Sequence, residues 1–193
     1  MAESKLDPDV VWMEPKLRGV FPLDGFHISN SLKTAIKKQD YSVSLNEAFA
    51  DVVDACADRE ETWINATIRQ GYLELFEVGH AQSIEVWRDD KLIGGVYGVT
   101  LGAAFFGESM FSRATNGSKI ALAYLVAHLN KCGLQLFDTQ FLTPHLASLG
   151  AIEIEREEYL ERLSRAIQSP ELFRDYSVAP SVDETLQRSN QTS

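Results

Sequence analysis

The chain has 193 residues and a formal net charge of −10, from 18 basic and 28 acidic side chains. This length fits one domain or one domain with a small appendage, and a hydrophobic fraction of 45% supplies an ordinary globular core. No apolar run approaches the roughly 20 residues that span a bilayer, and the first residues lack the apolar stretch of a secretory signal. The negative charge argues against generic, charge-driven nucleic-acid binding. We therefore expect a cytoplasmic globular protein.

Cysteine and histidine spacing gives no sign of a metal site. Cys56 and Cys132 lie in separate helical patterns without C-x-x-C spacing, which favours two buried free thiols. The four histidines lack H-E-x-x-H spacing. His128 and Cys132 form a helical i,i+4 pair, for which packing is favoured over nucleophilic catalysis. We expect no metal and no other cofactor.

The organisation along the chain suggests one main domain. Residues 1–11 look like a solvated lead-in, residues 12–168 carry the periodic patterns, and residues 169–193 lack periodicity. We expect the last segment to be an irregular or disordered tail.

In the first part of this domain, short helices alternate with a strand. Ser29 is suited to cap a helix through Lys38, and residues 41–45 alternate like a strand. Asn46 is expected to cap the next helix. A further helix is predicted from about Asn65 to Val78, with Gly79 as its stop.

The centre of the chain predicts an antiparallel meander. Residues 83–87 alternate, Asp89 and Asp90 form a turn, and apolar runs over 92–101 and 103–111 follow. The remaining predicted elements are a helix from Asn116 or Thr115 to about Cys132, a strand over 134–139, a short helix over 144–149, a strand over 151–154 and a polar helix over 156–167. This is an α+β pattern. It fits the N-acetyltransferase-like (GNAT-like) fold, a mixed and mostly antiparallel sheet flanked by helices.

Two carboxylates at the ends of apolar runs are the strongest candidates for chemistry. Glu108 follows the run over 96–106, and Asp138 ends the run over 134–138. Carboxylates are costly to bury, so such residues usually have a polar partner or a reaction to serve. Gln140 lies two residues after Asp138, so on a strand the two side chains would face the same side and contact one another or one substrate.

An ordered set of short motifs makes the family recognisable. The chain resembles the bacterial leucyl/phenylalanyl-tRNA–protein transferases over roughly 12–165, through residues 26–33, 61–64, 79–87, 92–99, 107–113, 118–119, 138–140 and 145–150. The resemblance implies transfer of leucine or phenylalanine from Leu-tRNA or Phe-tRNA to proteins that begin with Arg or Lys. The product is thereby marked for degradation. It also implies a monomer that works without a membrane or a cofactor.

The resemblance also assigns roles to individual residues. The tRNA end and the donor side chain would be bound by Trp12, Trp63, Val96, Phe105, Ser109, Leu129 and Phe137. Trp63 would stack on the terminal adenine. The reaction is attack of a neutral amine on an ester, so it needs a proton acceptor and donors for the developing oxyanion. Glu108 would hold a cationic group, while Asp138, through Gln140, would either accept the proton or only orient the amine.

Two departures from the family pattern and two alternatives stand beside this interpretation. The chain starts close to Val11 and is expected to lack the usual small N-terminal domain, and Trp12-Met13 stands where many members have a tryptophan pair. One alternative is an acetyl-CoA-dependent N-acetyltransferase, although residues 113–118 place glycine one position late for its pyrophosphate loop. The other is a non-enzymatic adaptor for N-terminal degradation signals.

The segment 14–38 is locally basic in an otherwise acidic chain. A polar partner could therefore bind at this segment alone.

Overall fold

The computed structural model describes residues 15–60, 62–170, 173 and 179–187. In this part of the chain the strands form one sheet in the order β2-β3-β4-β5-β6-β1-β7. Their bounds are β1 Leu17–Phe21, β2 Ser42–Leu45, β3 Ala81–Arg88, β4 Lys91–Leu101, β5 Ala104–Ser112, β6 Leu136–Gln140 and β7 Ile152–Glu155. The sheet is antiparallel apart from the parallel pairing of β5 with β6.

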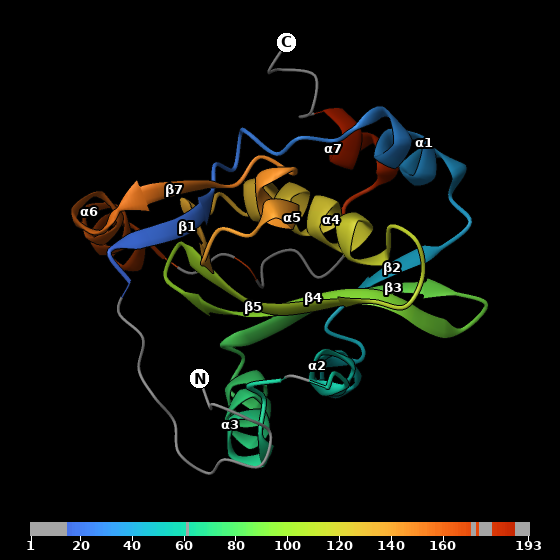
Figure 1. The fold of residues 1–193 in the computed structure, drawn as a ribbon, viewed down its shortest axis with the longest axis horizontal. Coiled ribbons are helices and arrows are strands. Elements are labelled where there is room, and N and C mark those ends of the chain that lie inside the picture. The colour runs from blue at the N-terminus through green and yellow to red at the C-terminus, as the bar shows by residue number, and fades with distance from the viewer. Residues whose placement is uncertain (1–14, 61, 171–172, 174–178, 188–193) are drawn as a thin grey trace.

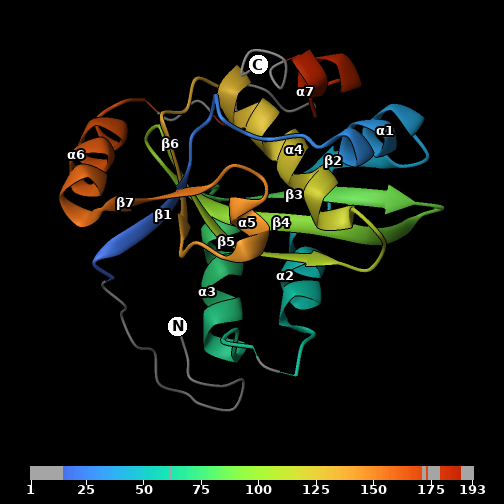
Figure 2. The ribbon, with the colours of Figure 1, turned by 45° about the horizontal axis from the view of Figure 1, so that its top comes forward.

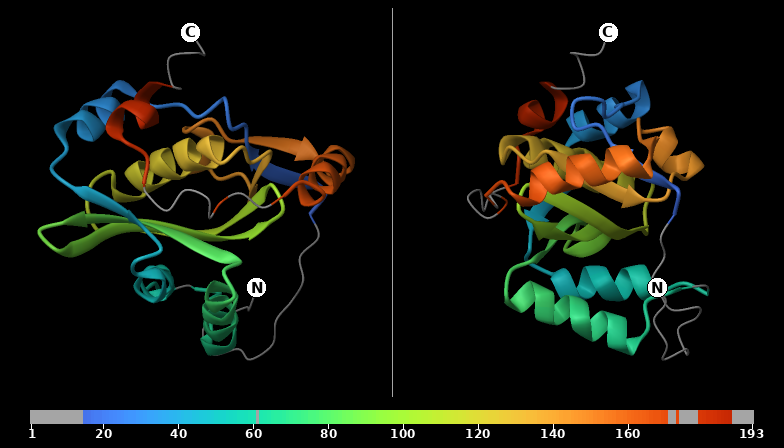
Figure 3. Two further views of the ribbon diagram at one scale, coloured as in Figure 1. Left: turned by 180° about the vertical axis from the view of Figure 1, so that it is seen from behind. Right: turned by 90° about the vertical axis from the view of Figure 1, so that its left-hand side faces the viewer.

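The helices cover both faces of this sheet. They are α1 Asn30–Lys38, α2 Phe49–Ala57, α3 Ala66–Glu77, α4 Gly117–Lys131, α5 Pro144–Ala147, α6 Arg156–Ile167 and α7 Val182–Gln187. Helix α4 packs on β3, β4 and β5, with α1 and α7 outside it, and α2 and α3 lie on the opposite face (Figures 1 and 2). Helix α6 packs beside β1, β5 and β6 at one end of the sheet (Figure 3). The expected GNAT-like α+β fold is confirmed.

Local capping explains several helix boundaries that the sequence predicted. The Ser29 hydroxyl accepts a hydrogen bond from the amide of Leu32 over 3.3 Å, and Asn65 Oδ1 accepts one from the amide of Ile68 over 2.8 Å. Each cap satisfies an amide that the first helical turn leaves without a partner. Gly79 follows α3 with a φ of 81°, a left-handed conformation that glycine adopts without steric cost.

The expected capping role of Asn46 is wrong. Helix α2 begins at Phe49 and has no side-chain cap. Asn46 instead has a φ of 59°, and its Nδ2 donates to Gln82 Oε1 over 2.6 Å. Its Oδ1 accepts from the amide of Ser83 over 2.7 Å. Asparagine tolerates this left-handed conformation, and here it joins the turn after β2 to the neighbouring strand.

The expectation of an irregular tail is wrong for residues 182–187, which form α7. The helix begins with a capping box, in which the Ser181 hydroxyl accepts from the Glu184 amide over 3.2 Å and Glu184 Oε2 accepts from the Ser181 amide over 2.7 Å. Leu186 on this helix is buried, and so is Phe173, which precedes the helix in the chain. A short helix gives little periodicity, so only the Ser-x-x-Glu spacing could have revealed it.

A β-bulge interrupts the pairing of β4 with β5. Gly98 pairs with Gly107 and Tyr97 pairs with Ser109, so Glu108 is the extra residue on β5. A bulge re-aims a side chain and strengthens the local twist, and bulges occur often beside active sites. Gly98 is required on the opposite strand, because a Cβ there would lie 2.2 Å from the carbonyl oxygen of Phe106.

We predict that Gly98→Ala lowers the free energy of unfolding by about 1–3 kcal/mol, the cost of overpacking a well-filled site. Gly71→Ala is the matched control. Gly71 lies inside α3, and a Cβ added there would meet no other atom within 4 Å, so alanine should stabilise the protein by about 0.5–1 kcal/mol. Urea denaturation measures both changes. Equal stability of the two variants would contradict the close packing of Gly98 against the Phe106 carbonyl oxygen.

Candidate active site

Glu108 stands at the bulge in a largely buried position and is held by two neutral donors. The hydroxyl of Tyr72, on α3, donates to Glu108 Oε2 over 2.7 Å. The side-chain amide of Gln140, at the end of β6, donates to the same oxygen over 2.9 Å. Both bonds end on Oε2, which leaves Oε1 for a substrate donor.

The electrostatic environment of Glu108 favours its protonated form more than water does. Burial is the main cause and raises the pKa of this carboxyl, and the negative charge of Asp138 adds to the effect. The hydrogen bonds from Tyr72 and Gln140 oppose it, because they stabilise the charged form. A carboxyl with a raised pKa, kept in place by neutral donors, is suited to exchange a proton or to meet a substrate cation.

Asp138 has a different environment, in which charged and neutral donors surround the carboxylate. Arg18 on β1 donates from Nε to Oδ1 over 3.0 Å and from Nη2 to Oδ2 over 2.7 Å. The hydroxyl of Tyr159 on α6 donates to Oδ2 over 2.8 Å, and the backbone amide of Gln140 donates to Oδ1 over 2.7 Å. The carboxylate is 0% exposed, so all of its contacts are internal.

The Arg18 guanidinium is correspondingly committed to Asp138. Burial lowers the pKa of Arg18, but its hydrogen bond to Asp138 and the charge of that carboxylate outweigh burial and raise it overall. The spacing predicted that the side chains of Asp138 and Gln140 share one face of a strand, whereas the structure shows a contact from the backbone amide of Gln140 to the Asp138 carboxylate. Gln140 has a φ of 66°, so Asp138 fixes the unusual turn from which the Gln140 side chain reaches Glu108.

Two cavities meet at Glu108. An open cavity of about 490 Å³ is lined by Trp63, Glu108, Ser109, Gln140 and their neighbours. A smaller apolar cavity of about 80 Å³ is lined by Val96, Ser109, Phe137 and others, and Glu108 belongs to its wall as well. Larger cavities of about 620 and 730 Å³ lie elsewhere, so size alone does not identify this site.

The residues expected to bind substrate are therefore only partly brought together. Val96 and Phe137 line the small cavity with Ser109, whereas Phe105 and Leu129 are buried in the core around α4. Trp63 lines the open cavity and packs edge-on against Tyr72, with ring centroids 6.4 Å apart. Trp12 lies outside the described residues, and its expected contact to the tRNA end stays a prediction.

Several residues of the site were not singled out by sequence reasoning. Tyr72 and Tyr159 sit in ordinary helical patterns, so no local signal marked them. Arg18 was noticed only as part of a basic segment. Thr139 and His145 also line the open cavity. Thr139 Oγ1 and His145 Nε2 are buried, and no described residue forms a hydrogen bond with either atom. Burial, followed by the charge of Lys119, lowers the pKa of His145, so the ring is neutral near pH 7.

The start of α4 offers little room for the pyrophosphate of an acetyl donor. The amide of Ser118 in the first turn donates to the Ser112 hydroxyl over 3.2 Å. A Cβ on Gly94 would lie 2.4 Å from the carbonyl carbon of Gly117, so strand and helix are already in close contact there.

Among the described residues, no cluster of three or more His, Cys, Asp or Glu side chains could hold a metal ion. Within the same part of the chain, no helix is long and apolar enough to cross a membrane.

Comparison with solved structures supports the fold. The crystal structure of FemX matches with a TM-score of 0.53 at 12% sequence identity, over 83% of this chain and 66% of the FemX chain. At this identity the likeness concerns the fold alone.

Comparison with sequences supports the family. The model of the leucyl/phenylalanyl-tRNA protein transferase family matches residues 20–164. A leucyl/phenylalanyl-tRNA–protein transferase of Cereibacter sphaeroides is 57% identical over the whole chain, which covers 90% of that relative. The corresponding protein of Ruegeria sp. is 58% identical, with 91% of its length covered, and that of Roseobacter denitrificans is 54% identical. The chain belongs to the leucyl/phenylalanyl-tRNA–protein transferase family of aminoacyltransferases.

Proposed function

We propose that this enzyme transfers leucine or phenylalanine from Leu-tRNA or Phe-tRNA to the N-terminal amine of proteins that begin with Arg or Lys. The transfer marks these proteins for degradation through an N-degron pathway. Family membership supports the aminoacyl-tRNA donor and the protein acceptor. We place the reaction in the bacterial cytoplasm, where aminoacyl-tRNA is found, and expect the enzyme to act as a monomer.

The observation that carries this proposal is the position of Glu108 between the two cavities. The apolar cavity accepts the donor side chain, because burying a polar or charged side chain there would cost several kcal/mol. The open cavity, with Trp63 on its wall, accepts the terminal adenosine and the incoming amine. The ester bond then lies beside Glu108, at the boundary between the two.

In this proposal the two carboxylates have different roles. Glu108 Oε1 faces the substrate amine and accepts its proton as the amine nitrogen attacks the ester carbonyl carbon. The bond from that carbon to the ribose oxygen then breaks, and Glu108 passes the proton to the ribose oxygen, which leaves the carboxylate ionised again. Gln140 donates through Nε2 to Glu108, so its carbonyl oxygen can accept a hydrogen bond from the amine. Asp138 does not touch the substrate, because its oxygens are occupied by Arg18, Tyr159 and Gln140.

Two further atoms are suited to the donor. Thr139 Oγ1 and His145 Nε2 have no hydrogen-bond partner among the described residues, and both belong to residues that line the open cavity. Buried polar atoms without a hydrogen bond are costly, so a ligand that supplies one is favoured. We assign them to the ester oxygen and the ribose hydroxyls of the donor. The tRNA body would make few phosphate contacts, since Arg18 in the basic segment is turned inward to Asp138.

One test of the proposed function examines the acceptor protein. Radiolabelled Leu-tRNA and Phe-tRNA should label proteins that begin with Arg or Lys, the acceptors that the family resemblance implies. Otherwise identical proteins that begin with Asp or Met serve as controls and should remain unlabelled. Equal labelling of the Met-initiated protein would remove the acceptor assignment. Absence of transfer to any acceptor would contradict the proposed reaction.

A second test of the proposed function compares variants of the two carboxylates in stability and in transfer rate. Burial raises the pKa of Glu108, so the folded state binds this proton more tightly than the unfolded chain, and stability falls as pH rises toward the folded pKa. Glu108→Gln removes this cost, and should unfold at neutral pH with the same or a higher free energy. Its single-turnover rate should nevertheless fall about 10²–10⁴-fold.

Asp138→Asn is the matched comparison, because it makes the same chemical change at the other carboxyl. It leaves the half-buried Arg18 without its anion, and should lower the free energy of unfolding by about 3 kcal/mol, the lower end of the range for a broken buried pair. Urea denaturation and single-turnover transfer measure the two quantities. A large loss of stability in Glu108→Gln, or none in Asp138→Asn, would reverse the assigned roles.

A further inference from the structure

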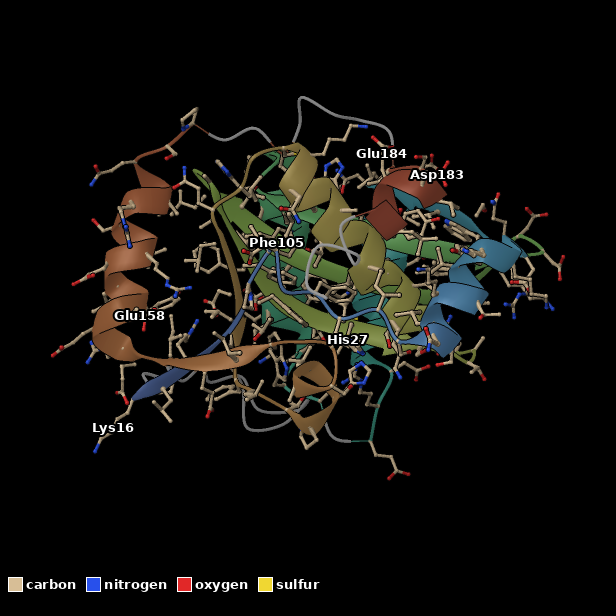
Figure 4. All side chains as sticks on the ribbon, turned by 90° about the horizontal axis from the view of Figure 1, so that it is seen from above. Lys16, His27, Phe105, Glu158, Asp183 and Glu184 are labelled. Carbon is tan, nitrogen blue, oxygen red and sulfur yellow. The ribbon has the colours of Figure 1, made fainter. Side chains whose placement is uncertain are left out.

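One residue of the C-terminal segment, Phe173, reaches the core beneath the proposed site. Its ring is 2% exposed and stacks on Phe105, with centroids 5.9 Å apart and an angle of 15° between the planes. Phe105 meets Phe137 edge-on, with centroids 5.4 Å apart, and Phe137 lines the small apolar cavity. Figure 4 shows Phe105 near the middle of the molecule. The three rings connect the C-terminal segment to the wall of the cavity.

The backbone of Phe173 is anchored independently of its ring. Its carbonyl oxygen lies 3.2 Å from His128 Nε2 and accepts a hydrogen bond from Cys132 Sγ over 3.7 Å. His128 and Cys132 are 0% and 2% exposed, at the C-terminal end of α4. Burial lowers the pKa of His128, so the ring is neutral and Nε2–H serves as donor to this carbonyl. The end of α4 therefore fixes where the Phe173 ring stands.

We propose that Phe173 is a positioning residue, which sets the depth of the donor pocket through Phe105 and Phe137 and thereby the preference between leucyl and phenylalanyl donors. The inference rests on the proposed function, because it takes the small cavity as the donor pocket. Interiors are packed to near-crystalline density, so Phe105 cannot retreat while Phe173 fills the space behind it. In a cavity of about 80 Å³, a small retreat of Phe137 changes which side chain fits.

The experiment measures kcat/KM with Phe-tRNA and with Leu-tRNA for Phe173→Leu and Phe173→Ala. We expect the ratio of phenylalanine to leucine transfer to rise about tenfold, the lower end of the range for one methylene in an apolar pocket. Partial unfolding lowers both rates alike and leaves the ratio unchanged. Phe173→Leu keeps most of the side-chain volume, so the ratio can be measured in this variant even if Phe173→Ala fails to fold.

Four further variants, one of them Phe105→Leu alone, test whether the effect is transmitted through the three rings. Leu186→Ala truncates another buried residue of the same C-terminal segment, on α7, which packs on α4 and α1. It should lower stability without changing the ratio. The double variant Phe173→Leu/Phe105→Leu should shift the ratio no further than Phe105→Leu alone, because both act on Phe137 by one route. Val96→Phe fills the cavity directly, and should lower the ratio.

The outcomes separate this inference from the proposed function. An unchanged ratio in both Phe173 variants, together with a lowered ratio in Val96→Phe, would overturn the role of Phe173 and leave the donor pocket in place. An unchanged ratio in Val96→Phe as well would remove the donor-pocket assignment, and the inference with it. A shift in Leu186→Ala as large as that in Phe173→Leu would show general loosening of the fold, and would also overturn the inference.

Discussion

The buried contact between Arg18 and Asp138 is the interaction on which the site depends. It joins β1 to β6, while Tyr159 adds α6 to the same carboxylate. The remaining bond of Asp138 goes to the backbone amide of Gln140, in the turn that ends β6. Because that turn has a left-handed conformation, which costs a residue with a side chain some energy, a fixed acceptor is needed to hold it. The orientation of Gln140, and through it Glu108, follows from this anchor.

Glu108 shows the opposite balance. It is a largely buried carboxyl with neutral donors, and burial raises its pKa. A buried carboxyl without a cationic partner lowers stability, and such groups are concentrated at functional sites. The bulge at Glu108 lies at the same place on the sheet as the close contact between Gly98 and Phe106. The fold thus gives up regular pairing and some stability at the position where the chemistry is proposed.

The sequence predicted those features that have local causes. The cap at Ser29, the helix start near Asn65, the meander and the GNAT-like fold follow from short-range patterns or from the family motifs. Glu108 and Asp138 were found because carboxylates at the ends of apolar runs are unusual. Their different environments were not predictable, since Arg18 is 120 residues from Asp138 and Tyr72 is 36 residues from Glu108. Asn46 was wrongly predicted to cap a helix because its partners, Gln82 and Ser83, lie on another strand. The burial of Phe173 was not predicted because a single buried residue leaves no periodic signal.

The central claim is that Glu108, and not Asp138, is the carboxyl whose ionisation limits transfer. The most direct measurement is the pH dependence of single-turnover transfer in the wild type and in Tyr72→Phe. The Tyr72 hydroxyl lowers the pKa of Glu108 by donating to its charged form, so its removal should raise that pKa. The account predicts that the rising limb of the pH–rate profile moves to higher pH in Tyr72→Phe. An unmoved limb, in a variant that still folds and transfers, would contradict it.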